Sequence, residues 1–292
     1  MKIALPILAA TATLMLTACA KDYPYRTSHP FLGAVKVVTD WSGKSSESVA
    51  PPVYTLRIGS QEHVVGGTTN VFGTLLVQGD YDLAAFSTPT KIGLSGNTAT
   101  VEDAETDGFI APYPDYFFAA YSRISVAADD TLHVTLPMIQ YVRQLDIKLT
   151  ATEGDYSRVV SATATLSGVA RAVDFTTSKL VGDTALTTRP FVRTDNTFAT
   201  SFRLLRTADL GSPTLTVDFV FDNGDTQSVS TEVPVQPIDP GKPDTTPDIG
   251  SVSPNIQVLI GDLQLPVKGE ATEVTITDWQ WGNGTGEDVG VK

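Results

Sequence analysis

Apolar and polar residues alternate with a period of two along most of this chain, and few stretches show helical spacing. β-Branched residues carry much of the alternation, and clusters of Gly, Asp, Asn and Pro interrupt it as turns do. In the first half we expect strands at 35–37, 53–58, 73–77, 81–86, 121–126 and 131–136. Six short strands in roughly a hundred residues come close to the about seven that are typical of a β-sandwich, which we place at residues 30–137.

Pro137 interrupts the alternation, and a second series of strands begins after it. The expected segments are Val142 to Leu149, 159–166, 169–175, 198–205 and a hairpin formed by 215–221 and 226–233. The turn of this hairpin contains Asn223-Gly224, and Asn-Gly permits the positive φ angles of a type I′ turn. These segments predict a second sandwich at residues 138–233.

Residues 234–255 are rich in proline, which lacks the amide donor of a strand ladder, so we expect an extended linker there. Strand patterns return in the tail, residues 256–292, which is too short to bury a core of its own. The tail could donate a strand to a neighbouring subunit, or it could fold back and complete the second sandwich.

The amino terminus has the layout of a secretory signal, with Lys2 followed by an apolar run to Leu16. Residues 16–19, Leu-Thr-Ala-Cys, resemble the lipobox of bacterial lipoproteins, so we expect residues 1–18 to be removed and Cys19 to carry diacylglycerol. Residues 19–29 would then be a tether. The alternative is an ordinary signal peptide that leaves a free thiol, which is a liability in an oxidising compartment.

Composition narrows the possible partners and cofactors. Thirty-three acidic residues against 20 basic ones give a net charge of −13, which argues against nucleic acid or anionic lipid as a partner. Because Cys19 is the single cysteine, the chain has no disulfide framework and no thiolate metal site. We expect no metal and no cofactor.

Several motifs occur in an order that resembles the fimbrillin-A-associated anchor proteins, lipoproteins that serve as anchor or minor subunits of the type V fimbriae of Bacteroides-like bacteria. Besides the lipobox, the motifs are VKVVTDWS (35–42), VQGDYDLAAFS (77–87), MIQYVRQLDIKLT (138–150), SATATLSGVARAVDFTT (161–177) and ATSFRLLR (199–206). The resemblance implies two tandem transthyretin-like β-sandwiches. It also implies assembly by strand exchange, in which a strand of one subunit completes the sheet of another.

On this reading the protein is a lipoprotein of the outer membrane, held by Cys19 and exposed at the cell surface as part of a fimbrium, with fimbrillin subunits as its protein partners. Two alternatives remain open. One is a surface lipoprotein that binds glycans, and the other is an adhesin at the tip of the same filament.

Side chains of the tail are the candidate partner-binding residues. Val274 and Ile276 alternate toward one face, and Trp279 and Trp281 are two apart, hence on one face of a strand. They could dock into a partner's groove, bind a glycan, or be buried in their own chain.

Residues that could carry chemistry are scattered. His29, His63 and His133 share no metal-ligand spacing and no nucleophile motif, so we expect neither an enzyme nor a small-molecule substrate. Trp41 is expected to pack in a core rather than stack on a sugar. The aromatic segment Ala111 to Ser122 is expected to be structural, although an exposed aromatic patch there would indicate a partner site.

Overall fold

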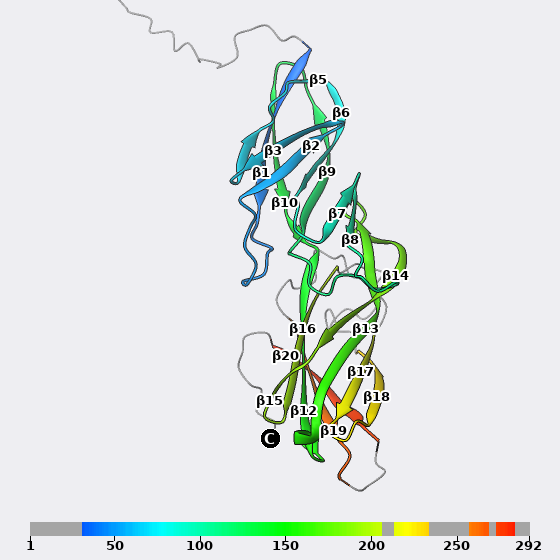
Figure 1. The fold of residues 1–292 in the computed structure, drawn as a ribbon. Helices are drawn as coiled ribbons and strands as arrows, with labels where there is room; N and C mark the ends of the chain where they lie inside the picture. Colours follow the sequence, from blue (N-terminus) through cyan, green and yellow to red (C-terminus); the bar gives the residue numbers. More distant parts are fainter. Residues whose placement is uncertain (1–30, 206–212, 234–256, 269–272, 284–292) are drawn as a thin grey trace, which may run out of the picture.

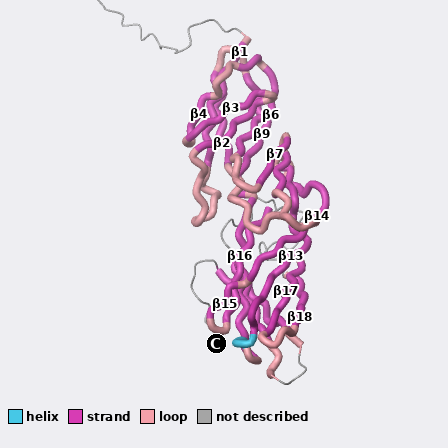
Figure 2. The backbone as a smooth tube through the Cα atoms, in the orientation of Figure 1, coloured by secondary structure: helices cyan, strands magenta, loops and turns pink. Residues whose placement is uncertain are grey.

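The computed structural model describes residues 31–205, 213–233, 257–268 and 273–283, and this part of the chain forms twenty β-strands and one short 3₁₀ turn. The all-β prediction is therefore confirmed. Figures 1 and 2 show the strands in two blocks stacked end to end. The expected signal peptide, Cys19, the tether and the Pro-rich linker lie outside the described residues.

The first block, here called the N-terminal sandwich, consists of two sheets. The four-stranded sheet contains β10 (Thr131–Pro137), β1 (Leu32–Asp40), β4 (Thr69–Val71) and β5 (Leu76–Val77). The five-stranded sheet has the order β11 (Ile139–Gln140), β9 (Phe118–Val126), β6 (Gly79–Phe86), β2 (Val53–Ile58) and β3 (Gln61–Gly66). Both sheets bury apolar side chains against one another, among them Val35, Leu56 and Leu136.

Strand β1 lies inside the four-stranded sheet and is paired on both sides. It runs parallel to β10 from Ala34↔Thr131 to Asp40↔Pro137, and antiparallel to β4 and β5 on its other side. Gly33 passes so close to the turn after β9 that an added Cβ would lie 2.1 Å from the carbonyl oxygen of Ala127. Only glycine fits there without a shift of the backbone.

The loop that follows β1 is held by a buried glutamine. Gln140 is 1% exposed, and its Oε1 accepts hydrogen bonds from the Ser45 backbone N–H and the Ser48 hydroxyl, both at 2.9 Å. Its Nε2 donates to the carbonyl of Val142. Because every polar atom of this amide is used, the loop is fixed to β11, the last strand before the second block.

The second block, here called the C-terminal sandwich, is built on one eleven-stranded sheet. Its main path is β18 (Thr226–Glu232), β17 (Thr214–Phe221), β13 (Val159–Asp174), β16 (Thr197–Leu205), β12 (Val142–Glu153), β19 (Gln257–Gln264) and β20 (Thr275–Asn283). Beside this path lie β14 (Lys179–Pro190), β15 (Val192–Thr194), β7 (Ile92–Ser95) and β8 (Thr98–Val101).

This sheet folds over into two layers. Strands β13 and β16 pair at one position only, Ala170↔Leu205. Apolar side chains from the strands on either side of this connection pack into one core. Strands β18 and β20, at opposite ends of the path, therefore meet again on the far side of the core. Two expected segments, 159–166 and 169–175, are one long strand whose register shifts near Gly168, where φ is +71°.

The two blocks are joined by a continuous apolar junction. Hairpin β7–β8 lies within residues 30–137, yet β8 pairs with β13 of the C-terminal sandwich. Phe86 and Phe117 pack against Phe175, and the fully buried Tyr141 donates a hydrogen bond to the Phe175 carbonyl. Buried apolar side chains thus fill the junction as they fill the interior of a domain, and in the described part of the chain no loose linker separates the two blocks.

The predicted hairpin of β17 and β18 is confirmed, but its turn differs from the type I′ prediction. The N–H of Gly224 donates to the carbonyl of Phe221, and the N–H of Phe221 donates to the carbonyl of Asp225. Gly224 has φ of +86°, whereas Asn223 is not in the left-handed region. This pattern is a type I turn followed by a glycine bulge, in which the Asn223 side chain accepts from the Asp225 N–H.

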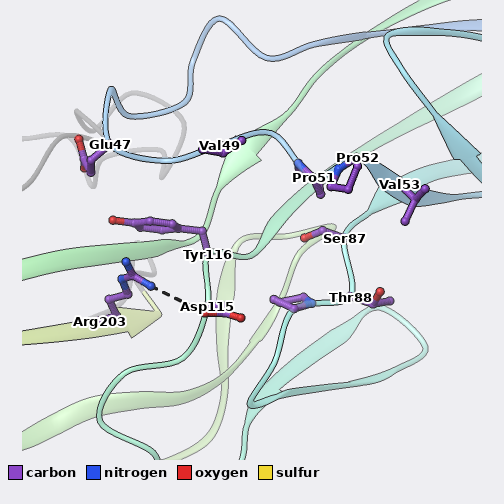
Figure 3. Close-up of a pocket in the computed structure, with 11 residues that line it drawn as sticks. Glu47, Val49, Pro51, Pro52, Val53, Ser87, Thr88, Asp115, Tyr116 and Arg203 are labelled. Carbon is purple, nitrogen blue, oxygen red and sulfur yellow. Dashed lines mark ion pairs between the residues drawn. The ribbon is translucent and has the colours of Figure 1, made fainter.

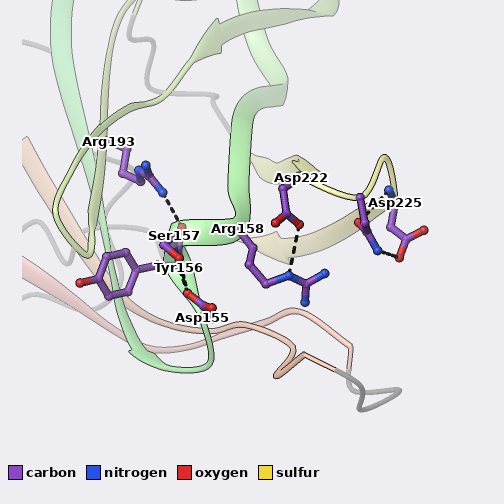
Figure 4. A network of polar contacts seen from close by, with 8 residues as sticks. Asp155, Tyr156, Ser157, Arg158, Arg193, Asp222 and Asp225 are labelled. Carbon is purple, nitrogen blue, oxygen red and sulfur yellow. Dashed lines mark hydrogen bonds and ion pairs between the residues drawn. The ribbon is translucent and has the colours of Figure 1, made fainter.

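Polar contacts close the far end of the C-terminal sandwich (Figure 4). Asp155 caps the 3₁₀ turn Tyr156–Arg158 by accepting from the N–H and hydroxyl of Ser157, and the hydroxyl bond is the main reason that the pKa of Asp155 lies below its ordinary value. Arg158 reaches Asp222 at 3.3 Å. These contacts tie the β12–β13 connection to the β17–β18 hairpin.

Candidate functional site

The strands of the tail complete the chain's own C-terminal sandwich in this structure. β19 pairs in parallel with β12, from Leu145↔Gln257 to Glu153↔Gln264, and β20 pairs antiparallel with β19. Of the two arrangements that the sequence left open, this is the one in which the tail folds back. Within the described residues β20 has β19 as its single ladder partner, so it is the edge of the sheet.

A β-bulge in β20 brings the four candidate side chains of the tail to the core. Asp278, at φ of +53°, is an extra residue opposite Gly261, and it shifts the alternation by one position. Val274 is 5% exposed, and the partly buried Ile276, Trp279 and Trp281 pack against the same core. The two tryptophans share a face, as their spacing predicts.

Trp279 joins the two edges of the sandwich. Its Nε1 donates to the hydroxyl of Thr231 on β18 at 3.1 Å. Its ring covers Gly261, where a Cβ would lie 2.8 Å from a ring carbon. A second bond, from the Val274 N–H to the side-chain carbonyl of Gln227, also runs from the tail to β18. Side-chain contacts, rather than a ladder of backbone hydrogen bonds, therefore hold β20 and the residues before it against β18.

The outer face of β20 is polar, with Thr275, Thr277 and Gln280 exposed. Trp281 differs from Trp279 in that its buried Nε1 has no acceptor among the described residues. Since the apolar side chains of the tail already serve their own core, what β20 can offer a partner is its backbone edge and this polar face.

A second candidate site is an open pocket of about 470 Å³ at the junction of the two blocks (Figure 3). Tyr116 and Arg203 line it on one side and Val49, Pro51 and Pro52 on the other; Glu47, Val53, Ser87, Thr88, Pro89 and Asp115 complete the lining. The pocket thus combines an aromatic ring, an arginine and carboxylates with an apolar rim.

Arg203 is held rigidly in this pocket. Its guanidinium carbon lies 4.1 Å from the ring centres of both Tyr113 and Tyr116, a double cation–π contact. The hydroxyls of both tyrosines donate to Gln144, at 3.0 and 3.3 Å. Burial is the main cause that raises the pKa of Tyr116 above its ordinary value. Both tyrosines lie in the aromatic segment 111–122, but no sequence pattern points to Arg203, which comes from β16, a strand distant in sequence.

The remaining residues singled out in the sequence have local roles where the structure describes them. Trp41 packs edge-on against Tyr54 and Phe118, as expected for a core residue. His63 contacts Phe72 edge-on, and His133 is exposed; His29 lies outside the described residues. The described part of the chain holds no cluster of three His, Cys, Asp or Glu side chains suited to a metal ion. Among the same residues there is no helix long and apolar enough to span a bilayer.

The stacked sandwiches with their shared junction core define an all-β protein of two end-to-end blocks. The family model of the fimbrillin-A associated anchor proteins Mfa1 and Mfa2 matches residues 53–283, most of the chain. The chain therefore belongs to this family, and the resemblance stated from sequence motifs is confirmed. A fimbrial anchor or adhesin role follows from this membership.

Solved structures share the fold at low sequence identity. The fimbrial anchor protein Mfa2 from Porphyromonas gingivalis is 11% identical, with a TM-score of 0.59 over 86% of this chain and 97% of that one. A candidate adhesin from Bacteroides ovatus is 9% identical, with a TM-score of 0.60 over 87% and 96%. A candidate polysaccharide-binding protein from Bacteroides thetaiotaomicron is 11% identical, with a TM-score of 0.54 over 80% and 92%. No curated protein matches the sequence.

Proposed function

We propose that this protein is a lipoprotein of the outer membrane that anchors a type V fimbria or serves as its minor subunit. The observation that carries the proposal is the family match over residues 53–283. The lipobox at residues 16–19 supports it, because diacylglycerol on Cys19 would supply the membrane attachment that an anchor needs. The role is mechanical and adhesive rather than catalytic.

We further propose that fimbrillin subunits pair with the protein by β-strand complementation at the edge of β20. An added strand would gain main-chain hydrogen bonds along β20, while the polar residues Thr275, Thr277 and Gln280 would face outward beside it. Trp279 and Trp281 contribute by holding β20 on the sandwich, so their replacement would weaken the edge indirectly.

Membrane attachment is tested with Cys19→Ala in cells, with Ala20→Ser as the matched control that leaves the lipidated residue in place. Native protein and the control should co-purify with a fimbrillin from detergent-solubilised cells and keep fibres on the cell. Cys19→Ala should shed fibres into the medium. Fibres that stay attached to Cys19→Ala cells would refute the anchoring role, and immunogold label at fibre ends far from the cell would favour the tip adhesin.

The pairing edge is tested with a photo-crosslinking residue at Gln280 on β20, and a control at Gln61 on β3, the edge of the five-stranded sheet. Both side chains are exposed, so both probes can reach a partner. Crosslinks to fimbrillin from position 280 but not from 61 are expected. The opposite pattern would move the pairing site to the N-terminal sandwich.

A second candidate function is glycan binding, and the pocket of Tyr116 and Arg203 favours it. A tyrosine ring beside an arginine and carboxylates can stack on a sugar and bind its hydroxyls. The fold shared with a candidate polysaccharide-binding protein agrees with this possibility. Saturable oligosaccharide binding that Tyr116→Ala abolishes, with Tyr121→Ala as a control outside the pocket, would support it; the absence of binding on glycan arrays would refute it.

A further inference from the structure

The parallel pair of β1 and β10 lies where tension would cross the molecule. β1 begins at the end of the N-terminal sandwich farthest from the C-terminal sandwich, and β10 runs beside it toward the junction (Figure 1). After β10 the chain continues through β11 into β12, a central strand of the C-terminal sandwich. A pull on the amino terminus therefore acts on β1, and a pull on the C-terminal sandwich acts on β10.

We propose a further function for this pair: Ala34–Asp40 and Thr131–Pro137 form a shear clamp that carries tensile force between the amino-terminal attachment and the C-terminal sandwich. The proposal rests on the proposed function for the source of the force, which is the lipid at one end and the fimbria at the other. The clamp itself is a property of the chain.

Shear follows from the direction of the two strands. Because β1 and β10 are parallel, force on the first residue of β1 and on the last residue of β10 slides the strands past each other along their axes. Such sliding must break the whole ladder of seven residue pairs together, whereas a pull at adjacent ends breaks one pair after another. Since each hydrogen bond adds only about 0.5–1.5 kcal/mol, their simultaneous rupture is what makes the barrier high.

Contacts at both ends of the ladder and beside it oppose the sliding. The Ala34 N–H donates to the Asp130 carbonyl at 2.9 Å, and the Met138 N–H donates to the Asp40 carbonyl at 2.8 Å. Val35 and Val37 on β1 are fully buried, so movement of β1 would also expose apolar surface. On its other side β1 is held by β4 and β5.

The clamp also protects the residues between its two strands. Residues 41–130 connect β1 to β10 through the rest of the N-terminal sandwich, and while the pair holds it gives force a direct path that bypasses this length of backbone. Their release would lengthen the molecule by up to about 300 Å, at roughly 3.4 Å for each extended residue. Below the clamp, the buried Tyr141 and the apolar junction pass force into the C-terminal sandwich.

Single-molecule pulling on purified mature chain without lipid tests the proposal, with Cys19 as a natural thiol handle. In the shear arrangement the second handle is Thr152→Cys, an exposed residue at the far end of β12. In the matched arrangement it is Ala127→Cys, an exposed residue in the turn before β10, so the same ladder is peeled from one end. Urea midpoints of both variants equal to that of the native chain establish that the substitutions leave stability unchanged.

We expect the shear arrangement to rupture at several times the force of the peeling arrangement, with a first extension of up to about 300 Å. Equal rupture forces, or a first event confined to the C-terminal sandwich, would overturn the clamp. The test needs neither membrane nor fimbrillin, so its failure is distinct from failure of the proposed anchoring, which the Cys19→Ala cells report.

Discussion

Replacing Trp279 with Phe and Thr231 with Val, singly and together, measures how much the contact between β20 and β18 stabilises the C-terminal sandwich. The indole N–H donates to the Thr231 hydroxyl at 3.1 Å, and both residues are partly buried. A neutral hydrogen bond of this kind has a net worth of about 1 kcal/mol. Thr231→Val should therefore lower the free energy of unfolding by about 1 kcal/mol.

Trp279→Phe should cost more than Thr231→Val, because it also removes ring surface that covers Gly261 and the core. In the double variant the second change removes a bond that is already lost, so the two effects should fall short of additivity by about 1 kcal/mol. Urea titrations that follow the C-terminal sandwich provide the free energies. Gln280→Ala, an exposed change on the same strand, is the control and should stay within about 0.5 kcal/mol of the native protein.

Strict additivity of the two changes would refute the contribution of this hydrogen bond. If Trp279→Phe and the double variant were both as stable as the native protein, the tail would not be seated on the sandwich in solution. The result bears on function, because an edge strand that is seated can receive a partner strand, whereas an unseated one is free to be donated.

Three further predictions follow from close contacts elsewhere. Gly33→Ala should destabilise the N-terminal sandwich by about 1–3 kcal/mol because its Cβ meets a backbone carbonyl, whereas Gly43→Ala, with no atom nearer than 3.9 Å, should be neutral in the same urea titration. Gln140→Leu should cost about 1–3 kcal/mol for the Ser45 N–H left unpaired, since the Ser48 hydroxyl keeps the Ser45 carbonyl as an acceptor, and faster proteolysis of the loop after β1 would reveal it. The pKa of Tyr121 is raised mainly because its hydroxyl donates to Asp82 at 2.7 Å; this contribution to stability is present at neutral pH and lost as pH rises through the raised pKa. Asp82→Asn should therefore shift the phenolate transition of Tyr121 to lower pH in a spectroscopic titration, and an unchanged transition would exclude this bond as the cause.

Alternation in the sequence predicts which segments are strands, and it does so well where pairing is local. The strand at 53–58 has the predicted bounds, and the hairpin around Asn223-Gly224 forms as expected. The turn type was wrong because a side-chain amide and one left-handed glycine accommodate the hairpin with a bulge.

Pairing between distant strands leaves no such mark in the sequence. Alternation assigns a face to each residue, but it does not say that β8 joins β13 or that β1 lies parallel to β10. The same limit applies to the pocket, where Arg203 on β16 and Tyr116 in the loop before β9 are brought together only by the fold. The bulge at Asp278 explains why the apolar positions of the tail step from Ile276 to Trp279.

The position of β19 in the sheet has a consequence for how the protein reaches its native state. β12 is synthesised well before one of its two neighbours, β19, which is among the last strands made. The pairing that begins at Leu145↔Gln257 can therefore form only late. Pairings between such distant segments form slowly, because the entropy of closing the long loop is lost before the pairing contacts can offset it. Until the tail arrives, Leu259 and Leu263, both fully buried in the native core, cannot fill their places. The C-terminal sandwich can thus finish folding only after the whole chain has been made. A chain truncated before the tail should be bound by chaperones and degraded by proteases.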